Sequence, residues 1–289
     1  MIAVFTFLSL LAFTANSLIC RLVLRGGLMD AAGFTAVRLV SGAAMLLVLA
    51  PALRGRHRLA VDAKGALALV AYALFFSYAY VGITAGAGAL IAFGAVQITM
   101  IGAGFWRGER LSGPEWAGLA MAVAGLVYLV LPGLSAPPLT AAMLMFLSGV
   151  AWGAYSLLGR GRGDPVHRTA SNFFLAAPVA LGVALIEHRS LHGTARGVAW
   201  AAVSGALTSA GGYILWYTAL QSLKATRAAM VQLIAPVMTA AGGVLLMGEP
   251  ATLRLFLAGV MVLGGVGFAV LHHLGKRPNV PKASTIRST

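Results

Sequence analysis

Long apolar runs alternate with short polar breaks along almost the whole chain. Uncharged stretches of about 20 residues recur, and the breaks between them carry arginine, glycine or proline, as at residues 54–58, 160–164 and 249–250. A helix of about 20 apolar residues spans the hydrocarbon core of a bilayer, whereas a barrel strand needs only about half that length. Backbone at membrane depth must also satisfy its own hydrogen bonds. The pattern therefore predicts an all-α integral membrane protein.

We expect ten transmembrane helices. Their predicted ranges are 2–20, 31–51, 64–83, 88–106, 114–132, 139–159, 169–187, 197–220, 228–247 and 251–272. The break between the third and fourth ranges carries no charge and is the least marked. Ten crossings use about 200 residues at roughly 20 per crossing, so only short loops remain. The function must then lie inside the bilayer or on those loops.

Composition excludes several classes of protein. Of the 289 residues, 60% are hydrophobic and only 10% are charged, while an ordinary soluble domain is about a quarter charged. The single cysteine, Cys20, excludes an internal disulfide framework and a cysteine-rich metal site. No phosphate-binding GxxxxGKS/T motif is present, which excludes an ATP-driven pump unless a partner supplies the motif. We expect no cofactor and no bound metal.

The net charge of +14 indicates orientation in a membrane rather than a nucleic-acid partner. With a cytoplasmic N-terminus, 15 of the 21 basic residues fall on the inner side, five on the outer side, and Arg38 lies within the second span. Cytoplasmic loops of membrane proteins carry the excess of lysine and arginine. We therefore expect a bacterial inner-membrane protein with both termini in the cytoplasm and a solvated basic tail at 276–289. The first span departs from this bias, with Arg21 and Arg25 outside.

The two halves of the chain resemble each other at a nearly constant offset. At an offset of 139 or 140, the matched positions include Ser9 and Ser148, Ser17 and Ser156, Arg21 and Arg160, Thr99 and Thr239, and the Gly-Glu dipeptides at 108–109 and 248–249. We divide the chain into one five-helix repeat at 1–134, a second at 135–275, and the tail. Because five crossings are an odd number, the second repeat is inverted. Inverted repeats are typical of secondary transporters, with the substrate site between the halves.

Both repeats also resemble a known family. Residues 89–99 followed by Gly-Glu-Arg-Leu at 108–111, and residues 229–236 followed by Gly-Glu-Pro at 248–250, are similar to the EamA domain of the drug/metabolite transporter superfamily. The second repeat has the central proline of the family, Pro236, where the first has Val96, and Arg38 matches an arginine of the family's second helix. The resemblance covers about residues 2–272 and implies the transporter fold. Within the superfamily the chain is most similar to the amino-acid exporters, including the aromatic amino-acid branch.

Arg38 is the charged residue within a predicted span, about 10 Å from its outer end at 1.5 Å per residue. One interpretation is an anchor for a substrate carboxylate, which a guanidinium binds in a bidentate manner. The other is a structural arginine that snorkels or holds helices together. All seven acidic residues and all six histidines fall at span ends or in loops. Because proton relays in membranes use buried ionisable groups, this argues against proton antiport through a membrane-embedded glutamate.

Uncharged polar and aromatic side chains supply the other candidates for a substrate site. They are Tyr78, Gln97, Thr99, Trp152, Tyr155, Tyr213, Trp216 and Gln232. Trp152 is too central for an interfacial aromatic belt, whereas that interpretation stays open for Tyr78 and Trp216. Tyr213 and Trp216 share one helix face. A buried glutamine either bonds a neighbouring helix or faces a wet cavity, and both interpretations stay open.

We hypothesise a secondary transporter that exports amino acids, aromatic and other neutral ones, or similar small metabolites by alternating access. Its partners are then a small-molecule substrate and the lipid bilayer, and a monomer suffices. The alternative is an efflux transporter for drugs or aromatic cations, which the aromatic residues favour and the missing membrane carboxylate disfavours. A membrane enzyme or other non-transport protein is the weaker alternative, because the spans hold no constellation of titratable groups for catalysis.

Overall fold

The computed structural model describes residues 2–54, 62–106, 112–133, 136–159, 164–187, 191–222 and 231–275. Over these residues the chain is helical, with one isolated bridge between Met29 and Gly193. The elements are α1 (Ile2–Arg25), α2 (Ala31–Arg54), α3 (Ala63–Gly82), α4 (Ala85–Trp106), α5 (Gly113–Val130), α6 (Leu139–Gly159), α7 (Pro165–Ile186), α8 (Ala195–Val203), η1 (Ser204–Gly211), α9 (Gly212–Ser222), α11 (Ile234–Met247) and α12 (Leu253–Gly275). The all-α prediction is confirmed for the described part of the chain.

In the part of the chain that the structure describes, eight helical segments are long and apolar enough to cross a membrane. They are α1 to α7 and the continuous segment formed by α8, η1 and α9. Within the described residues, the apolar helices Ile234–Met247 and Leu253–Ala269 are shorter than these eight. The first eight predicted spans are confirmed, with their ends shifted by a few residues. The count of ten stays a prediction, and the start of the ninth predicted span lies outside the described residues.

Polar caps set the beginnings of several helices. Asp62, Asp164 and Thr194 each accept hydrogen bonds from backbone amides in the first turn of α3, α7 and α8, respectively. Such caps satisfy amide groups that have no partner within the helix. The weakly marked break after the third span is the two-residue turn Ile83-Thr84, where the Thr84 hydroxyl accepts a hydrogen bond from the amide of Ala87.

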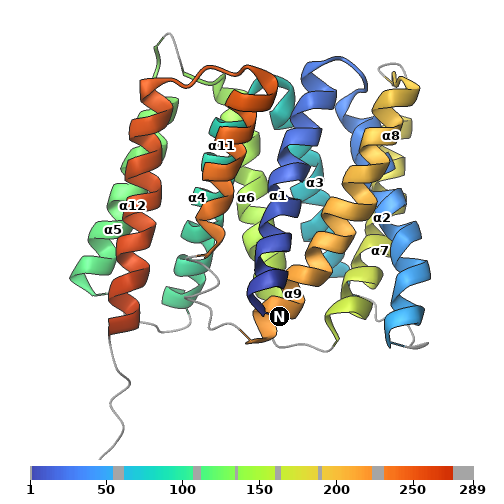
Figure 1. The fold of residues 1–289 in the computed structure, drawn as a ribbon, viewed down its shortest axis with the longest axis horizontal. Coiled ribbons are helices and arrows are strands. Elements are labelled where there is room, and N and C mark those ends of the chain that lie inside the picture. Colours follow the sequence, from blue (N-terminus) through green and yellow to red (C-terminus); the bar gives the residue numbers. More distant parts are fainter. Residues whose placement is uncertain are drawn as a thin grey trace, which may run out of the picture.

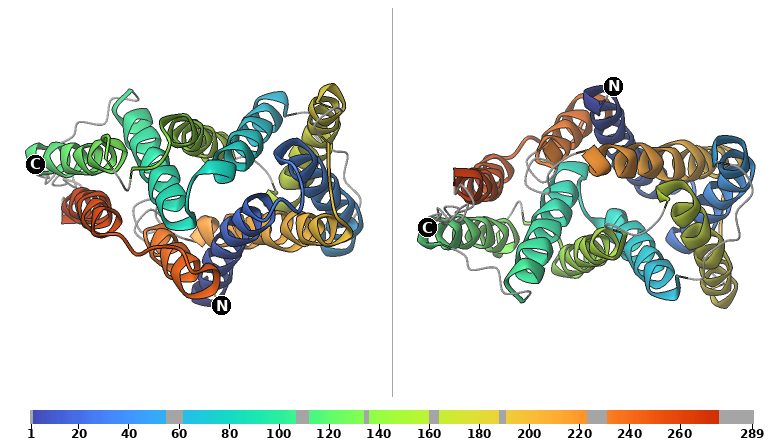
Figure 2. Two further views of the ribbon diagram at one scale, coloured as in Figure 1. Left: turned by 90° about the horizontal axis from the view of Figure 1, so that it is seen from above. Right: turned by 90° about the horizontal axis from the view of Figure 1, so that it is seen from below.

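The helices stand side by side in one bundle and run alternately in opposite directions (Figure 1). Helices α5 and α12 pack against each other at one edge, and α2, α7 and α8 lie at the opposite edge (Figure 2). Between these edges, α3 packs against α6, α4 against α6 and α11, and α1 against α9, η1 and α11. Helix α12 ends at the same end of the bundle at which α1 begins (Figure 1).

Glycine lets two of these helix pairs approach closely. A Cβ added to Gly118 of α5 would lie 2.4 Å from the carbonyl oxygen of Gly265 in α12. One added to Gly149 of α6 would lie 2.3 Å from the carbonyl oxygen of Ala92 in α4. Because lipid is as apolar as the helix surfaces, close packing at small residues contributes much of the attraction between membrane helices.

The eighth helical segment changes to π geometry in its middle, over η1. A π-turn adds a residue to the helical turn and is frequent at functional sites. Here η1 lies so close to α2 that a Cβ on Gly205 would be 2.0 Å from the carbonyl oxygen of Arg38. This contact fixes η1 beside the one arginine that the sequence places within a span.

We expect Gly205→Ala to destabilise the protein, because the added methyl group has no room between η1 and the α2 backbone. Overpacking of this kind costs about 1–3 kcal/mol, so the midpoint of thermal unfolding in detergent should fall. Gly182→Ala in α7 is the matched control, since nothing lies within 4 Å of its added Cβ and a helix gains up to about 1 kcal/mol from that exchange. Equal midpoints for the two variants would contradict the close contact.

Candidate functional site

Buried aromatic rings from α1, α3, α6 and α9 meet inside the bundle. This aromatic cluster consists of Phe13, Tyr72, Phe76, Trp152, Tyr155, Tyr213 and Trp216. The ring centroid of Trp152 is 4.7 Å from that of Tyr213 and 4.9 Å from that of Tyr72. The rings of Tyr155 and Phe13 follow at 5.5 and 5.7 Å. Trp152 is therefore the centre of the cluster, and each such ring pair contributes about 0.5–1.5 kcal/mol beyond its buried area.

Arg38 of α2 is fully buried beside the aromatic cluster. Its Nε donates a hydrogen bond to the Ser209 hydroxyl at 2.9 Å, and its Nη2 donates to the hydroxyls of Tyr72 at 3.1 Å and Tyr213 at 3.2 Å. The guanidinium carbon also lies 5.2 and 5.4 Å from the ring centroids of Tyr72 and Phe76, a distance at which an aromatic face attracts a cation. One charged group thus connects α2 with α3, η1 and α9.

The charge of Arg38 has no acidic partner among the described residues. None of their ion pairs includes Arg38, and its buried Nη1 makes no hydrogen bond within the described part of the chain. A guanidinium stays protonated, and burying a charge at membrane depth is costly unless it is paired or solvated. Among the described residues, hydroxyl oxygens and aromatic faces are therefore the groups that stabilise this positive charge.

Asn16 of α1 completes the polar side of the site. Its Oδ1 accepts hydrogen bonds from the hydroxyls of Ser204 at 2.8 Å and of Thr208 and Ser209 at 3.4 Å each. Its Nδ2 donates to the hydroxyl of Tyr72 at 3.4 Å. The π geometry of η1 presents three hydroxyls to this one amide, so Asn16 and Arg38 belong to a single hydrogen-bonded network.

A small cavity borders the aromatic cluster. It is lined by Phe13, Ser17, Tyr72, Phe76, Ala92, Phe93, Val96, Gly149 and Trp152, and its volume is about 30 Å³. A cavity of that size holds about two water molecules, which is too little for an amino acid. In this structure the rings of α1, α3 and α6 therefore pack closely, and the space beside them is too small for a substrate of that size.

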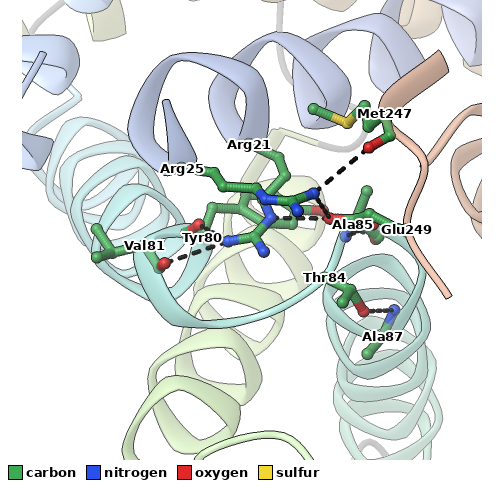
Figure 3. Close-up of polar contacts among 9 residues, drawn as sticks. All are labelled: Arg21, Arg25, Tyr80, Val81, Thr84, Ala85, Ala87, Met247 and Glu249. Carbon is green, nitrogen blue, oxygen red and sulfur yellow. Dashed lines mark hydrogen bonds and ion pairs between the residues drawn. The ribbon is translucent and has the colours of Figure 1, made fainter. Parts of the chain in front are cut away.

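A buried ion pair closes the bundle at the end where α1 terminates (Figure 3). Arg21 Nε donates to Glu249 Oε1 at 2.9 Å, and Glu249 Oε2 accepts a hydrogen bond from the amide of Ala85, the first residue of α4, at 2.7 Å. Arg21 Nη1 donates to the carbonyl oxygens of Tyr80 at 2.8 Å and Val81 at 3.1 Å, in the last turn of α3. The charges suit the positive N-terminus of α4 and the negative C-terminus of α3.

The Arg21–Glu249 pair lies one helical turn from the cavity. On α1, Arg21 follows the cavity-lining Ser17 by four residues, and on α3, Tyr80 follows the cavity-lining Phe76 by four residues. Four residues span about 6 Å along a helix. Arg25 adds a weaker contact at this end, since its Nη1 is 3.5 Å from the carbonyl oxygen of Met247 (Figure 3). The pair thus ties α1, α3 and α4 to the segment that follows α11.

The structure brings five of the predicted site residues together. Trp152, Tyr155, Tyr213 and Trp216 belong to the aromatic cluster, and Arg38 is hydrogen-bonded to Tyr213. For Arg38, the bonds to three other elements match the structural interpretation, while its unpaired charge keeps the carboxylate interpretation open.

The other four predicted residues lie outside the cluster. Thr99 turns back on its own helix, where its hydroxyl donates to the carbonyl oxygen of Ala95 at 2.8 Å. Tyr78 is half-buried, and none of the ring contacts of the aromatic cluster includes it. Gln97 is buried on α4, and Gln232 is buried two residues before α11 begins.

Sequence reasoning missed Phe13, Asn16, Tyr72 and Phe76. Tyr72, Phe76 and Tyr80 follow one another at intervals of four residues, which places them on one face of a helix. This spacing could have predicted an aromatic face on α3. Tyr78 does not share that face. The hydrogen bonds of Asn16 join it to hydroxyls of η1, whose π geometry the sequence pattern does not reveal.

A second hollow of about 1090 Å³ opens between α4, α11 and α12. Its lining is almost entirely apolar and includes Leu90, Val237, Val244, Phe256 and Val260, with Thr252 as its hydroxyl-bearing residue. A specific ligand site needs a few converging polar groups. The polar network of Arg38 and Asn16 makes the aromatic cluster the better candidate for the functional site.

Comparisons with known proteins concern the family and the fold of the chain. A sequence model described as the EamA-like transporter family matches residues 139–271. An uncharacterized protein of Pseudomonas aeruginosa is 50% identical over 275 residues, which cover 94% of this chain and 95% of that protein. An uncharacterized transporter of Archaeoglobus fulgidus is 27% identical over 232 residues, which cover 78% of this chain and 83% of that protein.

A solved crystal structure of another protein has a similar fold. The likeness has a TM-score of 0.66 at 19% sequence identity, and it covers 96% of this chain and 99% of the other. At that identity the likeness concerns the fold alone. Because nearly the whole of both chains aligns, the complete bundle is the shared unit.

We expect Glu249→Gln to loosen the closed end of the bundle. The substitution leaves Arg21 buried without its counter-charge, and removing one partner of a buried ion pair costs about 3–5 kcal/mol. Cys20, the single cysteine, is fully buried next to Arg21 and serves as a natural reporter. Its reaction with N-ethylmaleimide should accelerate at least about tenfold, which corresponds to about 1.4 kcal/mol.

Glu115→Gln is the matched control for this experiment. Glu115 is also a buried carboxylate, but it accepts hydrogen bonds from Ser112 at the start of α5, which packs against α12 rather than α1. Cys20 should react at the wild-type rate in that variant. An unchanged rate in Glu249→Gln would show that the ion pair does not hold this end closed.

Proposed function

We propose that the chain is a member of the EamA-like transporter family, whose model matches residues 139–271. In this proposal it is a secondary transporter that exports amino acids, aromatic and other neutral ones, or similar small metabolites. The observation that carries this proposal is the aromatic cluster with the buried charge of Arg38 at its side. Aromatic faces bind many ring systems and discriminate weakly among them. Arg38 supplies the one strong polar determinant.

The packing of the bundle supports two inverted five-helix repeats. In this proposal the segment α8–η1–α9 is the eighth span, and α11 and α12 are the ninth and tenth. Exchanging the two halves replaces each helix by its counterpart five spans away. The helix pairs α2–α7, α4–α11 and α5–α12 are then unchanged. The pair α3–α6 becomes α9–α1, and the pair α4–α6 becomes α11–α1. All of these pairs are in contact. Two such halves can exchange conformations, which opens a midplane site to each side in turn.

The charge of the site argues against the efflux of cations. A permanent aromatic cation would meet the positive Arg38, and no carboxylate among the described residues pairs with that arginine. Two like charges in a site of low polarity repel strongly. The aromatic cluster alone suits a cation, but the polar network beside it favours a substrate with a negatively charged group.

We place the protein in the bacterial inner membrane with both termini in the cytoplasm. The basic residues support this orientation, as 15 of the 21 fall on the proposed inner side. The bundle is compatible with it, since α12 ends at the end of the bundle at which α1 begins (Figure 1).

Transport by the purified protein in liposomes tests the proposed function. We expect counterflow of labelled tryptophan, and we expect Trp152→Ala to lower its initial rate at least about tenfold, since a loss of 1.4 kcal/mol in binding suffices for that. Trp152 contacts four other rings of the cluster, so its removal takes away the central aromatic face.

Trp116→Ala is the control for that variant. Trp116 is half exposed and contacts Phe105 away from the aromatic cluster, so its loss should leave counterflow near the wild-type rate. The proposal fails if no amino acid of a labelled panel exchanges across the membrane, and the site assignment fails if both tryptophan variants transport equally well.

Epitope tags at the two ends of the chain test the proposed topology. We expect antibodies to reach both tags only from the cytoplasmic face, because ten crossings return the chain to the side on which it began. A tag inserted between α2 and α3, which the proposal assigns to the cytoplasmic side, serves as the positive control. Tags on opposite faces would contradict an even number of crossings and, with it, the inverted repeat.

A further inference from the structure

The buried acidic groups of the described chain are all engaged away from the site. Glu115 and Glu249 are the buried carboxylates among the described residues. Glu115 is bonded to Ser112 at the start of α5, and Glu249 is paired with Arg21 at the end of α1. The positive charge of Arg38 is therefore available to a ligand.

Two tyrosines connect this charge to the aromatic faces. The rings of Tyr72 and Tyr213 lie 4.9 and 4.7 Å from the ring of Trp152, and the hydroxyls of the same two residues accept hydrogen bonds from Arg38 Nη2. Tyr72 also lines the cavity. If the cavity widens, an aromatic ligand can stack its ring on Trp152. A side chain on that ring then extends past Tyr72 and Tyr213 toward the guanidinium of Arg38.

The site offers little to an ammonium group. The Asn16 Oδ1 already accepts hydrogen bonds from Ser204, Thr208 and Ser209, and the oxygens of Tyr72 and Tyr213 already accept from Arg38. An ammonium group has three donors and no acceptor, so it needs free acceptors or a negative charge nearby. Burying it without either is costly.

We propose that the substrates of this site are aromatic monocarboxylates, recognised by the carboxylate, and that an α-ammonium group contributes little to binding. This inference rests on the proposed transport function. A monoanion beside Arg38 gives a neutral pair, a zwitterion leaves one net positive charge, and an amine leaves two. Since net charge is disfavoured in a closed membrane site, binding decreases in that order. Aromatic amino acids are then acceptable substrates, while aryl-substituted carboxylates without an amino group bind better.

Three compounds with the same ring separate the two groups. Tryptophan carries both, indole-3-propionate carries the carboxylate alone, and tryptamine carries the ammonium group alone. Equilibrium binding to the purified wild-type protein in detergent should be at least as tight for indole-3-propionate as for tryptophan. It should be weaker for tryptamine by about thirtyfold or more, because a charge-assisted interaction with a buried arginine is lost. The proposal is wrong if tryptamine binds as tightly as indole-3-propionate. It is also wrong if tryptophan binds and indole-3-propionate does not.

Variants locate the effect at Arg38. In Arg38→Gln, indole-3-propionate should bind no better than tryptamine, whereas Arg38→Lys should retain part of the preference. Arg254→Gln is the matched control, because Arg254 donates to the carbonyl oxygen of Leu131 at one edge of the bundle and should keep the wild-type order. If Arg38→Gln does not fold, the comparison of the three compounds on the wild-type protein still decides.

Transport measurements keep this inference separate from the proposed function. Binding in the predicted order without counterflow of any compound in liposomes supports the recognition of carboxylates and refutes transport. In the opposite case, tryptophan shows counterflow, and tryptamine inhibits it as strongly as indole-3-propionate. That result supports transport and overturns the recognition of carboxylates.

Discussion

A buried guanidinium without a carboxylate beside it is the constraint on which the centre of this protein depends. Arg38 carries a full charge inside a bundle of apolar helices. In the described part of the chain, hydroxyl groups of α3, η1 and α9 and the ring faces of Tyr72 and Phe76 stabilise this charge. That arrangement requires η1 to press against α2, which Gly205 makes possible. A structural role alone would be filled more cheaply by an apolar side chain, so the retained charge agrees with a role in binding.

A buried ion pair joins several helices at one end of the bundle, one turn beyond the cavity. Arg21 and Glu249 join the end of α3 to the beginning of α4 and bring α1 and the segment after α11 together. Their hydrogen bonds satisfy backbone groups that helix ends leave without partners. At the opposite end of the bundle, Asp62 before α3 pairs with Arg168 of α7. Rigid helices held at their ends by charged contacts allow the bundle to open by exchanging those contacts while the helices stay intact.

Much of the fold followed from the sequence, because lipid forces the chain into helices of a length that the apolar runs reveal. The first eight helical segments were predictable from run length, and the burial of Trp152 inside the bundle was predictable from its central position. Two features were not. The π geometry of η1, whose hydroxyls contact Asn16 and Arg38, has no sign in the apolar pattern. Glu249 looked like an interfacial loop residue because its partner lies 228 positions away. Pairing across such a distance leaves no periodic trace in the sequence.

The recognition of a carboxylate by Arg38 is best tested with a structure of the protein in which indole-3-propionate is bound. We expect the cavity to widen, the indole ring to lie against Trp152, and the carboxylate to lie within hydrogen-bond distance of Arg38 and the hydroxyls of Tyr72 and Tyr213. A ligand found instead in the apolar hollow between α11 and α12, with the contacts of Arg38 unchanged, would contradict it.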